Sequence, residues 1–92
     1  NNILNTFKFT ISDANLITQE QAYQKVFSLP EVQDYLKTIK NSHLDFDHEE
    51  SGDSWVFHLY EIVEDHTATR NWYYVNKYSG KITDLLGNPV KD

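Results

Sequence analysis

The sequence predicts an α+β fold, in which an N-terminal helical segment (helix, kink, helix) packs on one face of an antiparallel β-meander of about four strands. Two patterns indicate this. Apolar residues recur at helical spacing up to about residue 41, and from His43 onward they alternate with a period of two. Segregated helices followed by consecutive strands are typical of the α+β class. A length of 92 residues fits a single domain.

Two helices are expected at the start of this domain. Thr18 is a good N-cap, and Gln21 three residues later completes a capping box. Pro30 divides the segment, because the residue before a proline is disfavoured in a helix, and a proline suits the first turn of the next one. The second helix has apolar residues at i, i+3, i+4 and i+7, namely Val32, Tyr35, Leu36 and Ile39.

Four strands are expected after the helices. Residues 43–50 alternate weakly, and residues 54–63 give the strongest strand signal of the chain. A polar loop at 64–69 is expected before a strand at 72–76. The turn at 77–80 closes a hairpin with positive φ at Gly80, and the return strand starts at 81. One face of the second strand should carry Trp55, Phe57 and Leu59, and the other Val56, His58, Tyr60 and Ile62.

The chain therefore divides into three segments. Residues 1–15 are a linker or an edge strand, since residues 7–11 alternate between apolar and polar. Residues 16–88 form the single domain. Residues 89–92 are a C-terminal tail, because Gly87 and Pro89 are expected to end regular structure.

Composition excludes several classes of partner and site. A net charge of −6 argues against nucleic acid and anionic membrane surfaces, which would repel the chain. The lack of cysteine excludes disulfides, thiolate zinc sites and a cysteine nucleophile. No apolar run approaches ~18 residues, so we expect no membrane insertion by this domain.

No pattern in the chain indicates an enzyme or a cofactor. Glu61 with Asp65 or Asp47 would be a conceivable carboxylate pair, and His58 could serve Ser54 or Ser79 as a base. However, the sequence has no nucleophile elbow and no glycine-rich phosphate loop. We therefore predict no catalytic residues and no cofactor.

The stretch 43–66 is acidic, with eight of the fourteen Asp and Glu residues and no Lys or Arg. A calcium site, a face for a basic partner and a solvated strand face are the three interpretations. The EF-hand pattern is not matched, and the spacing of the four histidines does not suit zinc. We therefore predict no metal site, and a solvated face is favoured.

Aromatic side chains are the candidate partner-binding residues: Trp72, Tyr73, Tyr74, Tyr78 and Tyr60. Tyr and Trp are favoured at interfaces, but they are also ordinary cross-strand partners in a sheet, so both interpretations stay open. Arg70, the one arginine, is expected to form an ion pair with Asp65 or Glu64, with contact to an anion as the alternative.

Three segments together resemble a PepSY-type domain: 17–22 (Ile-Thr-Gln-Glu-Gln-Ala), 55–61 (Trp-Val-Phe-His-Leu-Tyr-Glu) and 72–82 (Trp-Tyr-Tyr-Val-Asn-Lys-Tyr-Ser-Gly-Lys-Ile). The run Asp-His-Thr-Ala-Thr at 65–69 is similar to a subgroup of small exported proteins and lipoproteins of Gram-positive bacteria. The resemblance covers residues 16–86. The two-helix opening with Pro30 departs from the single helix of the simplest family members.

The resemblance implies a cystatin-like arrangement and an extracytoplasmic location, secreted or anchored at the cell surface. It also implies a non-enzymatic module that binds a protein or peptide and modulates a peptidase or another envelope protein. No protease domain follows in this chain, so an inhibitory role does not carry over directly. The alternatives are a purely structural accessory domain of a lipoprotein and a weak calcium-binding domain. We expect a monomer, and whether a signal peptide or lipid anchor precedes Asn1 stays open.

Overall fold

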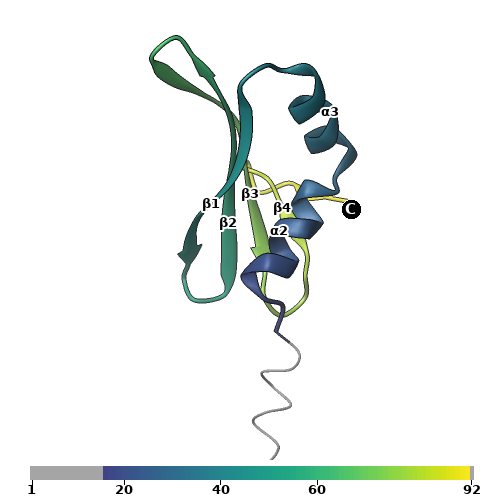
Figure 1. Cartoon of the computed structure of the whole chain (residues 1–92). Helices are drawn as coiled ribbons and strands as arrows, with labels where there is room; N and C mark the ends of the chain where they lie inside the picture. Colours follow the sequence, from purple (N-terminus) through teal and green to yellow (C-terminus); the bar gives the residue numbers. More distant parts are fainter. Residues whose placement is uncertain (1–15, 92) are drawn as a thin grey trace, which may run out of the picture.

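The computed structural model describes residues 16–91, so the predicted edge strand at 7–11 lies outside the described residues. Two helices are followed by five strands: α2 (Gln19–Phe27), α3 (Pro30–Thr38), β1 (Ser42–Glu50), β2 (Ser54–Val63), β3 (His66–Asn76), β4 (Ile82–Thr83) and β5 (Pro89–Val90). The sheet has the order β1-β2-β3-β4-β5, with antiparallel pairing throughout. Both helices lie on the same side of this meander, which confirms the α+β fold (Figure 1).

The helical segment begins and divides as its sequence predicts. Thr18 Oγ1 accepts a hydrogen bond from the Gln21 backbone N–H at 3.1 Å, and the Thr18 N–H donates to Gln21 Oε1 at 2.8 Å. This is the predicted capping box. Leu29 is extended (φ −63°, ψ 134°), and Pro30 is the first residue of α3. The helical hydrogen bonds are therefore interrupted between α2 and α3, and each helix packs on the sheet separately.

The core lies between the helices and one face of the sheet. Alternate strand residues face the helices because successive side chains of a strand point to opposite faces. The largest buried side chains on this face are Phe57, Leu59 and Tyr73, from the two central strands. The helices and the remaining strands add Ala22, Val26, Leu29, Val32, Leu44, Val75 and Ile82.

The predicted loop at 64–69 is wrong in extent. Strand β3 already begins at His66, and the connection from β2 is a two-residue turn of Glu64, with φ 58°, and Asp65. Thr67, Ala68 and Thr69 pair with Ile62, Glu61 and Tyr60 of β2. These residues are mostly exposed, so no apolar alternation marks this part of the strand.

The structure also differs from the predicted C-terminal tail at residues 89–92, because Pro89 and Val90 form strand β5 and pair with β4. The connecting turn is closed by Asp84, whose Oδ1 accepts hydrogen bonds from the backbone N–H groups of Leu86 (3.0 Å) and Asn88 (2.9 Å). Gly87 thus lies in a tight turn between strands, and Pro89 begins the next strand instead of ending regular structure. The sheet therefore extends to Val90.

The turn after β3 is the one that the sequence predicts. Gly80 has φ 75°, and its N–H donates to the Asn76 carbonyl at 2.8 Å. Among residues 16–91, no helix is long and apolar enough to cross a membrane.

Candidate functional site: the open face of the sheet

The sheet face opposite the helices carries the candidate site, and we call it the open face. Because Phe57, Leu59 and Tyr73 point to the helices, the residues that alternate with them point away. Cross-strand pairing arranges these residues in rows. His43, Tyr60 and Thr69 form one row, Asp45, His58 and Trp72 the next, and His48, Val56 and Tyr74 the third.

Four aromatic rings on the open face pack against one another, and we call them the aromatic stack. The His58 ring lies 4.0 Å from the Trp72 ring between centroids, with an interplanar angle of 10°. On its other side it stacks on Tyr60 at 4.6 Å, and Tyr60 stacks on His43 at 5.4 Å. Stacks at such distances contribute about 0.5–1.5 kcal/mol per pair beyond the buried area. The rings are therefore held in fixed positions on a rigid strand framework.

Val56 shows how tightly this face is packed. Its side chain is 0% exposed although it points away from the helices, and it does not belong to the helix-facing core. Its cross-strand neighbours are His48 and Tyr74. Since neither helix lies over this face, the surrounding side chains of the open face bury Val56. The open face thus has an ordered apolar centre of its own.

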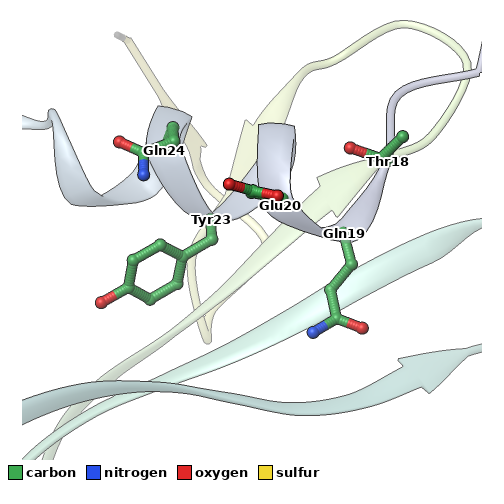
Figure 2. Close-up of a pocket in the computed structure, with 5 residues that line it drawn as sticks. All are labelled: Thr18, Gln19, Glu20, Tyr23 and Gln24. Carbon is green, nitrogen blue, oxygen red and sulfur yellow. The ribbon is translucent and has the colours of Figure 1, made fainter.

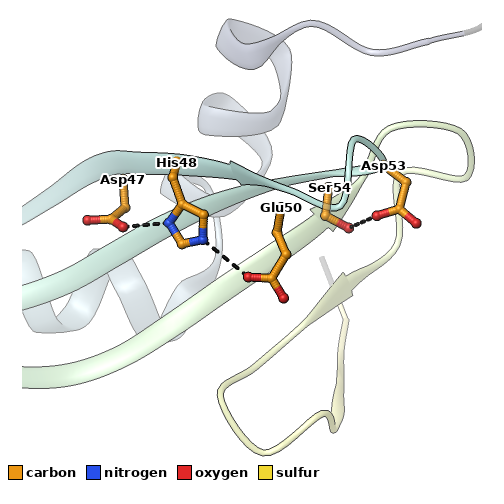
Figure 3. Close-up of polar contacts among 5 residues, drawn as sticks. All are labelled: Asp47, His48, Glu50, Asp53 and Ser54. Carbon is orange, nitrogen blue, oxygen red and sulfur yellow. Dashed lines mark hydrogen bonds and ion pairs between the residues drawn. The ribbon is translucent and has the colours of Figure 1, made fainter.

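Carboxylates of β1 border this centre. Asp45 accepts a hydrogen bond of 2.5 Å from the Tyr60 hydroxyl. The imidazole of His48 lies between two further carboxylates, with Nδ1 2.6 Å from Asp47 Oδ2 and Nε2 3.2 Å from Glu50 Oε1 (Figure 3). Asp47 occupies the point where the β1–β2 register shifts. One edge of the open face is therefore acidic.

Two histidines of the open face, His48 and His58, have pKa values that are shifted in opposite directions. The hydrogen bonds to Asp47 and then Glu50 raise the pKa of His48 above its ordinary value, because they stabilise the imidazolium form. Burial lowers the pKa of His58, although the charges of Asp47 and Asp45 act against this. His58 Nε2 shares a hydrogen bond of 2.8 Å with Thr69 Oγ1. His58 is thus favoured as a neutral ring within the aromatic stack.

Three of the predicted partner-binding residues lie on the open face: Tyr60, Trp72 and Tyr74. Tyr73 does not, and this corrects the sequence interpretation. It is 1% exposed, its hydroxyl donates to the Glu31 carboxylate on α3, and burial raises its pKa. Tyr78 is 64% exposed but belongs to the turn after β3, outside the aromatic stack.

The sequence interpretation missed His58 and His43 as members of the stack. The period-two alternation of β2 placed His58 beside Tyr60, but its stacking partner Trp72 is fixed by the pairing of β2 with β3. Arg70 also differs from expectation. Within residues 16–91 it has no ion pair with Asp65 or Glu64, and its guanidinium carbon lies 6.0 Å from the ring centroid of Tyr35 on α3.

The residues considered for metal binding or catalysis are not brought together. Within the described part of the chain, no group of three or more His, Asp or Glu residues is placed to hold a metal ion. Ser54 donates to the neighbouring Asp53 carboxylate at 3.2 Å, and Ser79 accepts from the Lys81 N–H in the turn. His58 is instead engaged with Thr69.

Two depressions occur elsewhere on the surface. A cavity of about 660 Å³ lies along α2, where the side chains of Gln19 and Tyr23 extend toward the sheet (Figure 2). Its lining is mostly polar and uncharged: Thr18, Gln19, Glu20, Tyr23 and Gln24. A groove of about 570 Å³ follows β4 and β5 and includes three lysines, Lys25, Lys81 and Lys91. Neither cavity contains a candidate residue from the sequence other than the turn residues 79–80.

Comparison of the chain with protein-family models, with curated proteins and with solved structures gives no match. The PepSY resemblance therefore depends on the sequence motifs quoted above.

Proposed function

We propose that this chain is a non-enzymatic module that binds a protein or peptide through the open face of its sheet. The observation that supports this most directly is the aromatic stack, which presents Trp72, His58 and Tyr60 in fixed positions on a face that no described element covers. Trp and Tyr are enriched at interaction hot spots because they offer large contact areas at a small cost in side-chain entropy. Preorganised rings lower that cost further.

The location and the class of partner belong to the same proposal. The motifs that resemble a PepSY-type domain favour an extracytoplasmic module, secreted or anchored at the cell surface, and a peptidase or another envelope protein as the partner. A cystatin-like fold belongs to this proposal as well, and two helices on one face of an antiparallel meander are compatible with it.

A purely structural accessory domain is the second candidate. It is supported by the packing of the stacked rings against one another, because cross-strand aromatic pairs stabilise many sheets without binding a partner. A calcium site is less well supported, because within residues 16–91 no group of three or more His, Asp or Glu residues is placed to hold a metal ion.

The test is capture from the envelope and secreted fractions of the producing cell, followed by mass spectrometry. Trp72→Ala removes the largest ring of the stack, and Tyr78→Ala is the matched control, because it removes an exposed ring outside the open face. Circular dichroism confirms that both variants are folded. We expect a protein that wild type and Tyr78→Ala retain and Trp72→Ala loses. Retention by Trp72→Ala would contradict the proposal, and an empty result with wild type would favour the structural candidate.

A further inference from the structure

The helix-facing side of the sheet contains a complete arrangement of cation, aromatic ring and carboxylate. Lys77 Nζ lies 4.3 Å from the centroid of the Trp55 ring and forms an ion pair with Glu49 of β1. The lysine is only 8% exposed. A cation over a ring with a carboxylate beside it is stabilised by both the ring quadrupole and the opposite charge. On this side of the sheet, Glu49 and the Trp55 ring therefore have a cation from the chain itself.

The open face has the other two components, but within residues 16–91 strands β1 to β3 bring no Lys or Arg to its carboxylates, and Lys81 and Lys91 line the groove along β4 and β5. Strand β1 contributes Asp45, Asp47 and Glu50 to it, and the second and third strands contribute Trp72 and Tyr74. Strands β1 and β2 and the turn between them contain no Lys or Arg. Arg70, the one Lys or Arg residue of β3, lies near the Tyr35 ring of α3. Within residues 16–91, His48 lies between Asp47 and Glu50, and Asp45 accepts a hydrogen bond from the Tyr60 hydroxyl. An imidazole carries a full charge only when it is protonated.

The geometry allows one extended ligand to reach both the carboxylates of β1 and the aromatic rings of β3. Asp45, His58 and Trp72 are cross-strand partners in one row, and neighbouring strands lie about 4.8 Å apart. The acidic edge and the Trp72 ring are thus about 10 Å apart, which two or three residues of an extended chain span. The stem of a lysine or arginine can pack along a ring while its charged end reaches a carboxylate.

Resting on the proposed function, we infer that the partner presents a Lys- or Arg-containing peptide segment to the open face, with its cations at Asp45, Asp47 and Glu50 and its stems on Trp72 and Tyr74. Charge complementarity selects this occupant. An acidic segment would meet three carboxylates, whereas a cationic one adds positive charge to a cluster in which His48 is the one imidazole between Asp47 and Glu50. An arginine suits the site well, because its planar guanidinium binds a carboxylate in a bidentate manner and also stacks on aromatic rings.

The experiment titrates ¹⁵N-labelled protein with three synthetic 12-residue peptides that alternate Ser with Arg, Gln or Glu. Amide chemical shifts report where each peptide binds. We expect the Arg peptide to shift amides of β1, β2 and β3 on the rows of Asp45 and His48, and the Glu peptide to produce no shifts there. Affinity for the Arg peptide should fall as salt rises from 0.05 to 0.5 M, because screening weakens exposed ion pairs.

A matched pair of variants separates a local site from the overall charge of −6. Asp47→Asn/Glu50→Gln removes two charges from the open face, and Asp34→Asn/Glu64→Gln removes two exposed charges from α3 and the β2–β3 turn. We expect the first variant to bind the Arg peptide about tenfold more weakly, and the second to stay within about twofold of wild type. Equal losses in both variants, or equal binding of the Arg and Gln peptides, would overturn the inference.

Trp72→Ala and Asp47→Asn/Glu50→Gln together distinguish a failure of the proposed function from a failure of this inference. If Trp72→Ala loses the cellular partner and Asp47→Asn/Glu50→Gln retains it with unchanged affinity, the open face binds but the cationic segment is wrong. If neither variant changes partner capture, both the proposed function and this inference fail.

Discussion

Substitution of two adjacent aromatic residues, Tyr73→Ala and Trp72→Ala, should have very different effects on stability. Tyr73 is 1% exposed in the core, and its hydroxyl donates to Glu31 on α3. Truncation of a buried ring to Ala costs about 3–5 kcal/mol in the free energy of unfolding. A 92-residue chain has a total stability of about 5–14 kcal/mol, so Tyr73→Ala removes a large share of it.

Trp72 is partly exposed on the open face, and its stabilising contact is the stack on His58 at 4.0 Å. Loss of this stack and of the associated buried area should cost about 1–2 kcal/mol. A third variant, Tyr73→Phe, keeps the ring and removes only the hydrogen bond to Glu31. Because that bond involves a charged acceptor, we expect a loss of about 1.5–3 kcal/mol.

Equilibrium unfolding in urea measures these differences, with the fluorescence of Trp55 as the probe common to all variants. With a slope of about 1.5 kcal/mol per molar urea, Tyr73→Ala should lower the midpoint by at least about 2 M, and Trp72→Ala by about 1 M. Equal shifts for the two alanine variants, or a larger shift for Trp72→Ala, would refute the assignment of these residues to opposite faces.

Two further predictions concern the histidines and the β3–β4 turn. In an NMR pH titration, His48 should titrate above 6.5 and His58 below it, because hydrogen bonds to Asp47 and Glu50 raise one pKa and burial lowers the other. His48 therefore contributes to the free energy of unfolding below pH 6.5, and this contribution is lost as the pH rises through its folded pKa. His58 contributes above pH 6.5, and its contribution is lost as the pH falls through its folded pKa. The reverse order of titration would contradict the hydrogen bonding of β1. Gly80→Ala should lower stability by about 1 kcal/mol, measured by thermal unfolding, because φ is 75°, while the added Cβ would meet only the Lys25 side chain, at 3.6 Å (Cε) and 3.8 Å (Nζ). An unchanged Tm would argue against the left-handed turn.

The features that the sequence alone determined are local ones. The capping box of Thr18 and Gln21, the break at Pro30 and the positive φ of Gly80 depend on residues within a few positions of one another. The alternation of β2 likewise separated Phe57 and Leu59 from His58 and Tyr60, because opposite faces follow directly from the geometry of a strand. These patterns were sufficient for the α+β class and for part of the open face.

The tertiary structure decided what depends on pairing between distant residues. The stack of His58 on Trp72 requires the register of β2 with β3, which local sequence does not specify. Tyr73 belongs to the core because the helices cover its side of the sheet. Residues 66–69 and β5 are strands because their backbone groups pair with neighbouring strands, although their side chains are largely exposed and lack an apolar pattern. Hydrophobic periodicity reports burial of side chains, whereas a strand at the edge of the core is held by backbone hydrogen bonds, which do not require apolar side chains.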